Sequence, residues 1–181
     1  MIWLAFTPVL LYLLSEGTRK RPQGEQKKDR SSTLGLAAAL AIMTILPSMI
    51  LWNQWRPSFS PHPLFYIGIT LGIIGAWFRV LAMRTLGRFF SRNIGIQSRH
   101  QVVDTGCYRF IRHPGYLGTL GTFFGFALST ASWLAVAGNL FCFFIAYTYR
   151  MRVEEKALVV FFGSAYQEYQ ARTWKLIPYV Y

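Results

Sequence analysis

The stretch RHPGYLGTLGTFFGFALSTASWLAVAGNLFCFFIAYTYR, residues 112–150, decides the fold. No charged side chain occurs between residue 115 and residue 149. A helix crosses about 30 Å of hydrocarbon with roughly 20 apolar residues, so this run is too long for a single crossing. The small residues Ser-Thr-Ala-Ser at 129–132 divide it into two helices joined by a tight turn. The stretch therefore predicts a helical hairpin that returns the chain to the side on which it began.

Three further apolar blocks precede the hairpin, at residues 1–14, 34–52 and 64–83. The chain is 53% hydrophobic and 17% aromatic, which is rich for a soluble protein of this size. The second and third blocks each reach crossing length. The first is short, but it lacks the charged start and cleavage site of a signal peptide, so it is interpreted as a first span. We expect one domain over residues 1–181, an all-α polytopic membrane protein with about five transmembrane helices.

The basic residues indicate how these spans are oriented. The chain carries 19 Lys and Arg and a net charge of +12. Five alternating spans put all of them on one face except Arg56 and Arg79, and the positive-inside rule makes that face cytoplasmic. Arg79, near the cytoplasmic end of the third span, is expected to extend its side chain to interfacial water. Nucleic acid is not needed to explain the charge, because no base-reading motif accompanies it.

Small residues recur at packing intervals in the third and fourth spans, and this spacing lets helices approach closely in lipid. They are Gly68, Gly72, Gly75, Gly118, Gly121 and Gly125. The basic segment 84–114 is a connector too long for a passive role. After the hairpin, helical periodicity over residues 150–172 predicts an amphipathic helix near the interface. Cys107 and Cys142 have no metal-binding spacing, and no metal is expected.

Polar groups that could carry chemistry gather at the two ends of the hairpin. Because the hairpin returns to its starting side, His113 and Arg150 are expected to be neighbours. Arg150 and Glu154, four residues apart, share one helix face. A structural role stays open, since the pair could be a surface ion pair worth at most about 1 kcal/mol, and His113 could be a helix cap.

Three blocks in fixed order resemble one family. They are LGRFFSRNIGIQ (86–97), VVDTGCYRFIRHPGYLG (102–118) and RMRVEEKALVVFFGSAYQEYQARTWKLIP (150–178). In this order they resemble the isoprenylcysteine carboxyl methyltransferase family of integral membrane methyltransferases. The resemblance covers residues 86–178, about half of the chain. It implies that residues 1–85 supply spans one to three and that residues 86–181 bind the cofactor and carry the reaction.

The resemblance further implies a cofactor, S-adenosyl-L-methionine, held on the cytoplasmic side without a Rossmann fold, in a pocket closed by the connector and the C-terminal helix. Arg150 would bind the substrate, and Arg150 and Glu154 would be the catalytic pair. The residues implied to line the cofactor pocket are Gln97, His100, Gln101, Val102, Val103, Tyr108, His113, Pro114, Gly115, Tyr116 and Glu154.

Methyl transfer from a sulfonium to a carboxylate suits such a site. The nucleophile is already ionised, so alignment and removal of water suffice and no general base is needed. Arg150 would hold the carboxylate through a forked pair of hydrogen bonds, and Glu154 would attract the cofactor's amino group. The acceptor implied is lipophilic or prenylated, a small molecule or a protein, reached from the membrane lipid.

Three alternatives stay open at this point. Methylation of an amine, as in phospholipid N-methylation, would need a route for the amine's proton. The ending KLIPYVY (175–181) also looks like the tails of NADPH-dependent membrane sterol reductases. A non-catalytic membrane protein would show a polar path through the spans, where only Arg79 lies deep.

Overall fold

The computed structural model describes residues 2–17, 30–54, 62–87 and 102–181. Over these ranges the chain is helical, with one isolated β-bridge between Ile111 and Trp174, and the all-α prediction is confirmed. The elements are η1 (Ile2–Phe6), α1 (Thr7–Gly17), α2 (Arg30–Gln54), α3 (Pro63–Leu86), η3 (Gly106–Arg109), α4 (Pro114–Leu128), α5 (Trp133–Phe162) and α6 (Ser164–Ala171).

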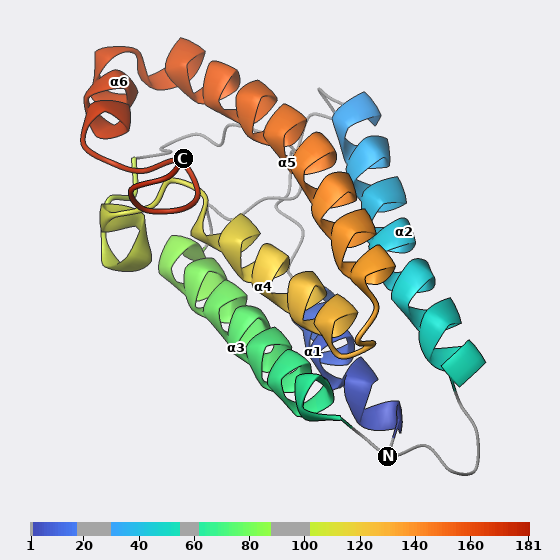
Figure 1. Ribbon diagram of the computed structural model, residues 1–181. Helices are drawn as coiled ribbons and strands as arrows, with labels where there is room; N and C mark the ends of the chain where they lie inside the picture. The colour runs from blue at the N-terminus through green and yellow to red at the C-terminus, as the bar shows by residue number, and fades with distance from the viewer. Residues whose placement is uncertain (1, 18–29, 55–61, 88–101) are drawn as a thin grey trace.

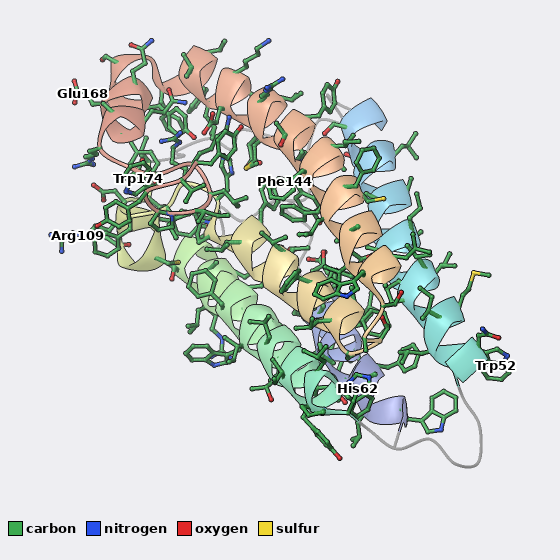
Figure 2. The ribbon with its side chains drawn as sticks, in the orientation of Figure 1. Trp52, His62, Arg109, Phe144, Glu168 and Trp174 are labelled. Atoms are coloured by element: carbon green, nitrogen blue, oxygen red, sulfur yellow. The ribbon has the colours of Figure 1, made fainter. Side chains whose placement is uncertain are left out.

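Helices α1 to α5 run in alternating directions along one bundle (Figure 1). α3 packs along α4, and α2 packs along α5. The alternation brings the first turns of α2 and α4, the last turns of α3 and α5, η3 and α6 to the same end, which we call the charged end. His62, which caps α3 by accepting a hydrogen bond from the Phe65 amide, marks the opposite end (Figure 2).

Three of the described helices are long and apolar enough to cross a membrane: α2 over Ser32–Asn53, α3, and the 30-residue α5. α1 with η1 forms a shorter apolar helix, and α4 has 15 residues, or about 22 Å. The chain is thus an integral membrane protein with a helical hairpin formed by α4 and α5. The count of five spans stays a prediction, because α1 and α4 are shorter than the hydrocarbon core is thick.

The turn of the hairpin lies where the small residues predict it. α4 ends at Leu128, and α5 begins at Trp133. The Ser132 hydroxyl caps α5 by accepting a hydrogen bond from the Ala135 amide, and Ala131 adopts a positive φ of 49°. The cap satisfies one amide that the first turn of a helix leaves unpaired.

The predicted amphipathic helix over 150–172 is wrong in its continuity. Its first part is the end of α5, and the chain breaks at Gly163 before α6 begins. Gly163 has a φ of 59°, a conformation that costs glycine little because it has no Cβ. Phe161, Ala165 and Tyr169 are four residues apart and would share one face of a continuous helix. Because of the break, Tyr169 is buried whereas Phe161 and Ala165 are exposed.

The glycines of α3 and α4 bring the two backbones into close approach. A Cβ on Gly68 would lie 2.5 Å from the carbonyl oxygen of Gly125, and a Cβ on Gly118 would lie 2.7 Å from the amide nitrogen of Arg79. Both distances are far below van der Waals contact, so only glycine fits at these two positions. The predicted small-residue packing of the third and fourth spans is therefore confirmed.

Gly75→Ala is expected to lower the free energy of unfolding in mixed micelles by roughly 1–3 kcal/mol, the usual cost of overpacking. The new Cβ would lie 2.6 Å from the carbonyl carbon of Gly121 and 2.8 Å from the Gly118 oxygen, and backbone atoms cannot rotate away. Gly35→Ala is the matched control, because Gly35 of α2 has nothing within 4 Å of an added Cβ. Equal losses in both variants would contradict this account of the α3–α4 contact.

Candidate functional site

The site begins at the first turn of α4, where His113 occupies the cap position and Pro114 the first helical position. Proline fits there because the amide it lacks would have no partner within the helix. The His113 side chain is buried, and its Nε2 lies 3.2 Å from Oε1 of Glu155 on α5. Helix α4 therefore starts at Pro114, and His113 contacts α5, as the predicted hairpin requires.

Glu155 is the centre of an ionic cluster at the charged end. Its Oε1 accepts a 2.8 Å hydrogen bond from Nε of Arg112, and its Oε2 lies 3.3 Å from Nζ of Lys175. With the His113 contact, these interactions tie two separate segments to α5: the turn before α4, which carries Arg112 and His113, and the C-terminal segment, which carries Lys175. All three cationic or ionisable side chains are mostly buried, so one carboxylate compensates charge that water does not reach.

The C-terminal segment is also held by its backbone. The Arg112 amide donates to the Trp174 carbonyl at 2.8 Å, and the Trp174 amide donates to the Phe110 carbonyl at 2.9 Å. The Arg112 guanidinium donates to the carbonyls of Gln170, at 3.0 Å, and Thr173. Figure 2 shows Trp174 in the loop that passes beside η3. The residues after α6 are thus fastened to the turn that precedes α4.

The Tyr116 hydroxyl lies between Arg150 and Glu154. It donates a 2.8 Å hydrogen bond to Oε2 of Glu154 and accepts a longer one, 3.5 Å, from Nε of Arg150. Arg150 is only 2% exposed, and its Nη1 donates to the Ser32 hydroxyl of α2 at 3.0 Å. The site thus joins α2, α4 and α5. Arg150 and Glu154 are bridged by a phenol, and the surface ion pair left open by the sequence does not describe them.

Aromatic rings lead from this polar group into the apolar core. The rings of His113 and Tyr116 stack with centroids 5.4 Å apart, and Tyr116 meets Tyr147 edge to face at 5.1 Å. Tyr147 in turn stacks on Phe143 at 4.3 Å. Stacked and edge-to-face pairs are the favoured geometries of such rings. A chain of ring contacts therefore connects the polar site to the apolar part of α5.

The remaining predicted residues lie on the connector side. Val102 and Val103 are half-buried in the segment before η3, and Tyr108 of η3 is buried. The Tyr108 carbonyl accepts a 2.7 Å hydrogen bond from the Tyr169 hydroxyl of α6. Burial raises the pKa of the Tyr108 and Tyr169 phenols, so both stay protonated at neutral pH. Gln97, His100 and Gln101 lie outside the described residues.

Four residues that contact the predicted site residues were not predicted from the sequence: Ser32, Arg112, Glu155 and Lys175. Glu155 and Arg112 stand beside Glu154 and His113 in the motifs, so a signal was present, but periodicity alone does not say which of two adjacent glutamates faces α4. Ser32 precedes Arg150 by 118 positions, and no local pattern points to it.

Comparisons with known proteins place the chain in one family. Residues 67–160 match the isoprenylcysteine carboxyl methyltransferase (ICMT) family. The chain is 35% identical over 116 residues to protein-S-isoprenylcysteine O-methyltransferase of Saccharomyces cerevisiae, covering 63% of this chain and 48% of the relative. It is 31% identical over 145 residues to protein-S-isoprenylcysteine O-methyltransferase B of Arabidopsis thaliana, covering 78% and 74%.

A relative from Dictyostelium discoideum with the same name as the yeast protein is 30% identical, with 75% of this chain and 60% of that protein covered. The chain thus spans about half of the yeast relative's length and three fifths of the Dictyostelium relative's. The fold is similar to the solved structure of the eukaryotic intramembrane Ras methyltransferase ICMT, with a TM-score of 0.62 and 20% identity over 97% of this chain and 62% of that one.

Proposed function

Because the chain belongs to the isoprenylcysteine carboxyl methyltransferase family, we propose that it methylates the carboxylate of an isoprenylcysteine-like acceptor with S-adenosyl-L-methionine. The cofactor, when bound, supplies a methyl group activated by a positively charged sulfur. The observation that carries the proposal is the bridged group Arg150–Tyr116–Glu154, which places a cation and an anion on either side of one hydroxyl.

The residues present fit the proposed cofactor. Among the described residues, Glu154 accepts a hydrogen bond through Oε2 and is half-buried, which leaves Oε1 for the ammonium of an amino acid moiety. The first turn of α4, with His113, Pro114, Gly115 and Tyr116, would hold the cofactor together with Glu154. Val102, Val103 and Tyr108 would line its connector side, and Gln97, His100 and Gln101 stay predicted members of the same pocket.

Arg150 would bind the acceptor carboxylate. Its guanidinium is buried, and the low dielectric around it strengthens attraction to an anion. A carboxylate is a stronger acceptor than a hydroxyl, so it would replace Ser32 as the partner of Nη1 and form a charge-assisted pair. Tyr116, hydrogen-bonded to both, would then hold the Arg150 and Glu154 side chains in a fixed relative orientation. This orientation would set the direction from which the acceptor approaches the cofactor.

The chain need not remove a proton from such an acceptor, because a carboxylate is ionised at neutral pH. It must instead exclude water and align the two reactants. Water is kept from Arg150 because this side chain is buried against the first turn of α2. The acceptor would be a prenylated cysteine, free or at the end of a protein, whose tail stays in the membrane lipid. The positive-inside rule assigns the charged end to the cytoplasm.

The test offers purified protein, in mixed micelles, N-acetyl-S-farnesylcysteine and S-adenosyl-L-methionine labelled in its methyl group. The matched control is the carboxamide of the same compound, which has the same tail and no carboxylate. We expect label in the carboxylate compound only, released as methanol by mild base because a methyl ester hydrolyses. Base-stable label on phosphatidylethanolamine, or NADPH binding without methyl-donor binding, would overturn the proposal.

A further inference from the structure

Arg79 of α3 is a buried cation that contacts both α1 and the start of α4, and it is only 5% exposed. The expectation that its side chain reaches interfacial water is wrong. It forms an ion pair with Glu16 of α1 and lies over the ring of Tyr12, 4.7 Å from its centroid. A charge so placed in a membrane protein is costly without compensation, and the chain supplies that compensation from α1.

The other half of the Arg79 fork binds the first turn of α4. Its Nη1 donates to the Gly115 carbonyl and to the Thr119 hydroxyl, both at 2.9 Å. The Thr119 hydroxyl itself donates to the Gly115 carbonyl at 3.0 Å. Arg79 Nη1, the Thr119 hydroxyl and the Gly115 carbonyl oxygen are thus joined pairwise in a closed triangle of hydrogen bonds. Because Nη2 contacts α1 and Nη1 contacts α4, one planar guanidinium joins three helices.

The triangle lies directly beside the site. Gly115 precedes Tyr116, whose hydroxyl bridges Arg150 and Glu154. Any rotation or shift of the first turn of α4 moves that hydroxyl relative to α5, where both of its partners are fixed. A displacement of about 1 Å in a reacting geometry can cost 100-fold in rate, so a contact that fixes this turn has consequences for alignment.

We propose that Arg79, held by Glu16, is a positioning residue for methyl transfer: it fixes the Gly115 carbonyl and thereby places the Tyr116 hydroxyl between Arg150 and Glu154. The inference rests on the proposed function and extends the working part of the protein to α1, which lies outside the residues that match the family. Arg79 acts through the α4 backbone and does not touch the reactants.

Two threonines of α4 provide a matched test. Thr119 and Thr122 are both fully buried, and each donates its hydroxyl to the carbonyl four residues earlier. Arg79 donates to Thr119, and no such contact joins it to Thr122 within the described residues. Thr119→Val therefore breaks the triangle, and Thr122→Val removes an equivalent helical hydrogen bond without touching it.

We expect Thr119→Val to lower kcat on N-acetyl-S-farnesylcysteine about tenfold, and Thr122→Val to change it less than twofold. Tyr116→Phe should itself lower kcat, and in that background Thr119→Val should cause no further loss, because its effect passes through the missing hydroxyl. Equal losses for the two threonines, or an undiminished tenfold loss in the Tyr116→Phe background, would overturn the proposal. If Thr119→Val does not fold, Glu16→Gln takes its place and is compared in the wild-type and Tyr116→Phe backgrounds in the same way.

If the wild-type chain methylates none of the acceptors offered, the proposed function fails. The effect of the Arg79 contacts on Tyr116 is then measured separately, by ¹⁹F NMR of protein labelled with 3-fluorotyrosine. The Tyr116 resonance is assigned by its loss in Tyr116→Phe. It should shift in Thr119→Val and stay in place in Thr122→Val. An unchanged Tyr116 resonance in Thr119→Val would refute the coupling independently of activity.

Discussion

Arg150→Ala is expected to lower kcat for carboxyl methylation by about 100-fold or more, the loss typical when a buried donor to a reacting oxygen is removed. Arg150 is almost wholly buried and has the fork geometry that matches a carboxylate. Its removal leaves the acceptor without a counter-charge in a region from which water is excluded. Affinity for S-adenosyl-L-methionine, measured by calorimetry, should change little, because the cofactor is assigned to Glu154 and the first turn of α4.

Two further variants make the Arg150 result specific. Arg150→Lys keeps the charge and loses the fork, so its kcat should fall between those of the wild type and Arg150→Ala. Arg152→Ala removes an exposed arginine from the same helix two residues later and should leave kcat within twofold. Full activity in Arg150→Ala, or equal losses at positions 150 and 152, would remove Arg150 from the site.

Glu155→Gln is expected to lower the free energy of unfolding by roughly 3 kcal/mol, because removing one partner of a buried ion pair leaves the other charge uncompensated. Glu155 contacts Arg112, His113 and Lys175, and each of these is mostly shielded from water. The amide keeps one acceptor oxygen and loses the charge. The C-terminal segment should loosen first, which limited proteolysis would detect as faster cleavage after α6.

Glu168→Gln is the control for this change. Glu168 is exposed on α6 and projects away from the bundle (Figure 2), so the same substitution there should change stability by less than about 0.5 kcal/mol. If Glu155→Gln is as stable as Glu168→Gln, the cluster around Glu155 does not hold the C-terminal segment, and the backbone hydrogen bonds of Arg112 and Trp174 alone must do so.

Much of the fold could be predicted from local chemistry. The hairpin turn at 129–132 and the start of α4 at Pro114 follow from residues whose preferences act over one or two turns. The close contact of α3 with α4 follows from glycines at regular intervals. The break at Gly163 was missed because a repeating apolar pattern continues across it, although a single glycine suffices to end a helix and redirect the chain.

The part of the candidate site that lies at the two ends of the hairpin could be predicted from the sequence, and the contacts from other helices could not. His113, Tyr116, Arg150 and Glu154 come together because the hairpin joins its two ends, and the motif positions suffice to predict that. Glu155 was missed because adjacent residues point about 100° apart on a helix, and only the rotation of α5 about its axis decides which glutamate meets His113. Ser32 and Glu16 belong to other helices and could not be found by spacing.

The sequence by itself determined that this protein is a helical membrane protein, which of its helices pack closely, and which end gathers the charged residues. Those properties depend on composition and on patterns within single helices, so they can be read in order along the chain. Only the tertiary structure decided the partners of the buried charges: Arg79 with Glu16, Arg150 with Ser32, and Glu155 with Arg112 and Lys175. A buried charge must find compensation wherever packing brings a complementary group, and that group need not be near it in sequence.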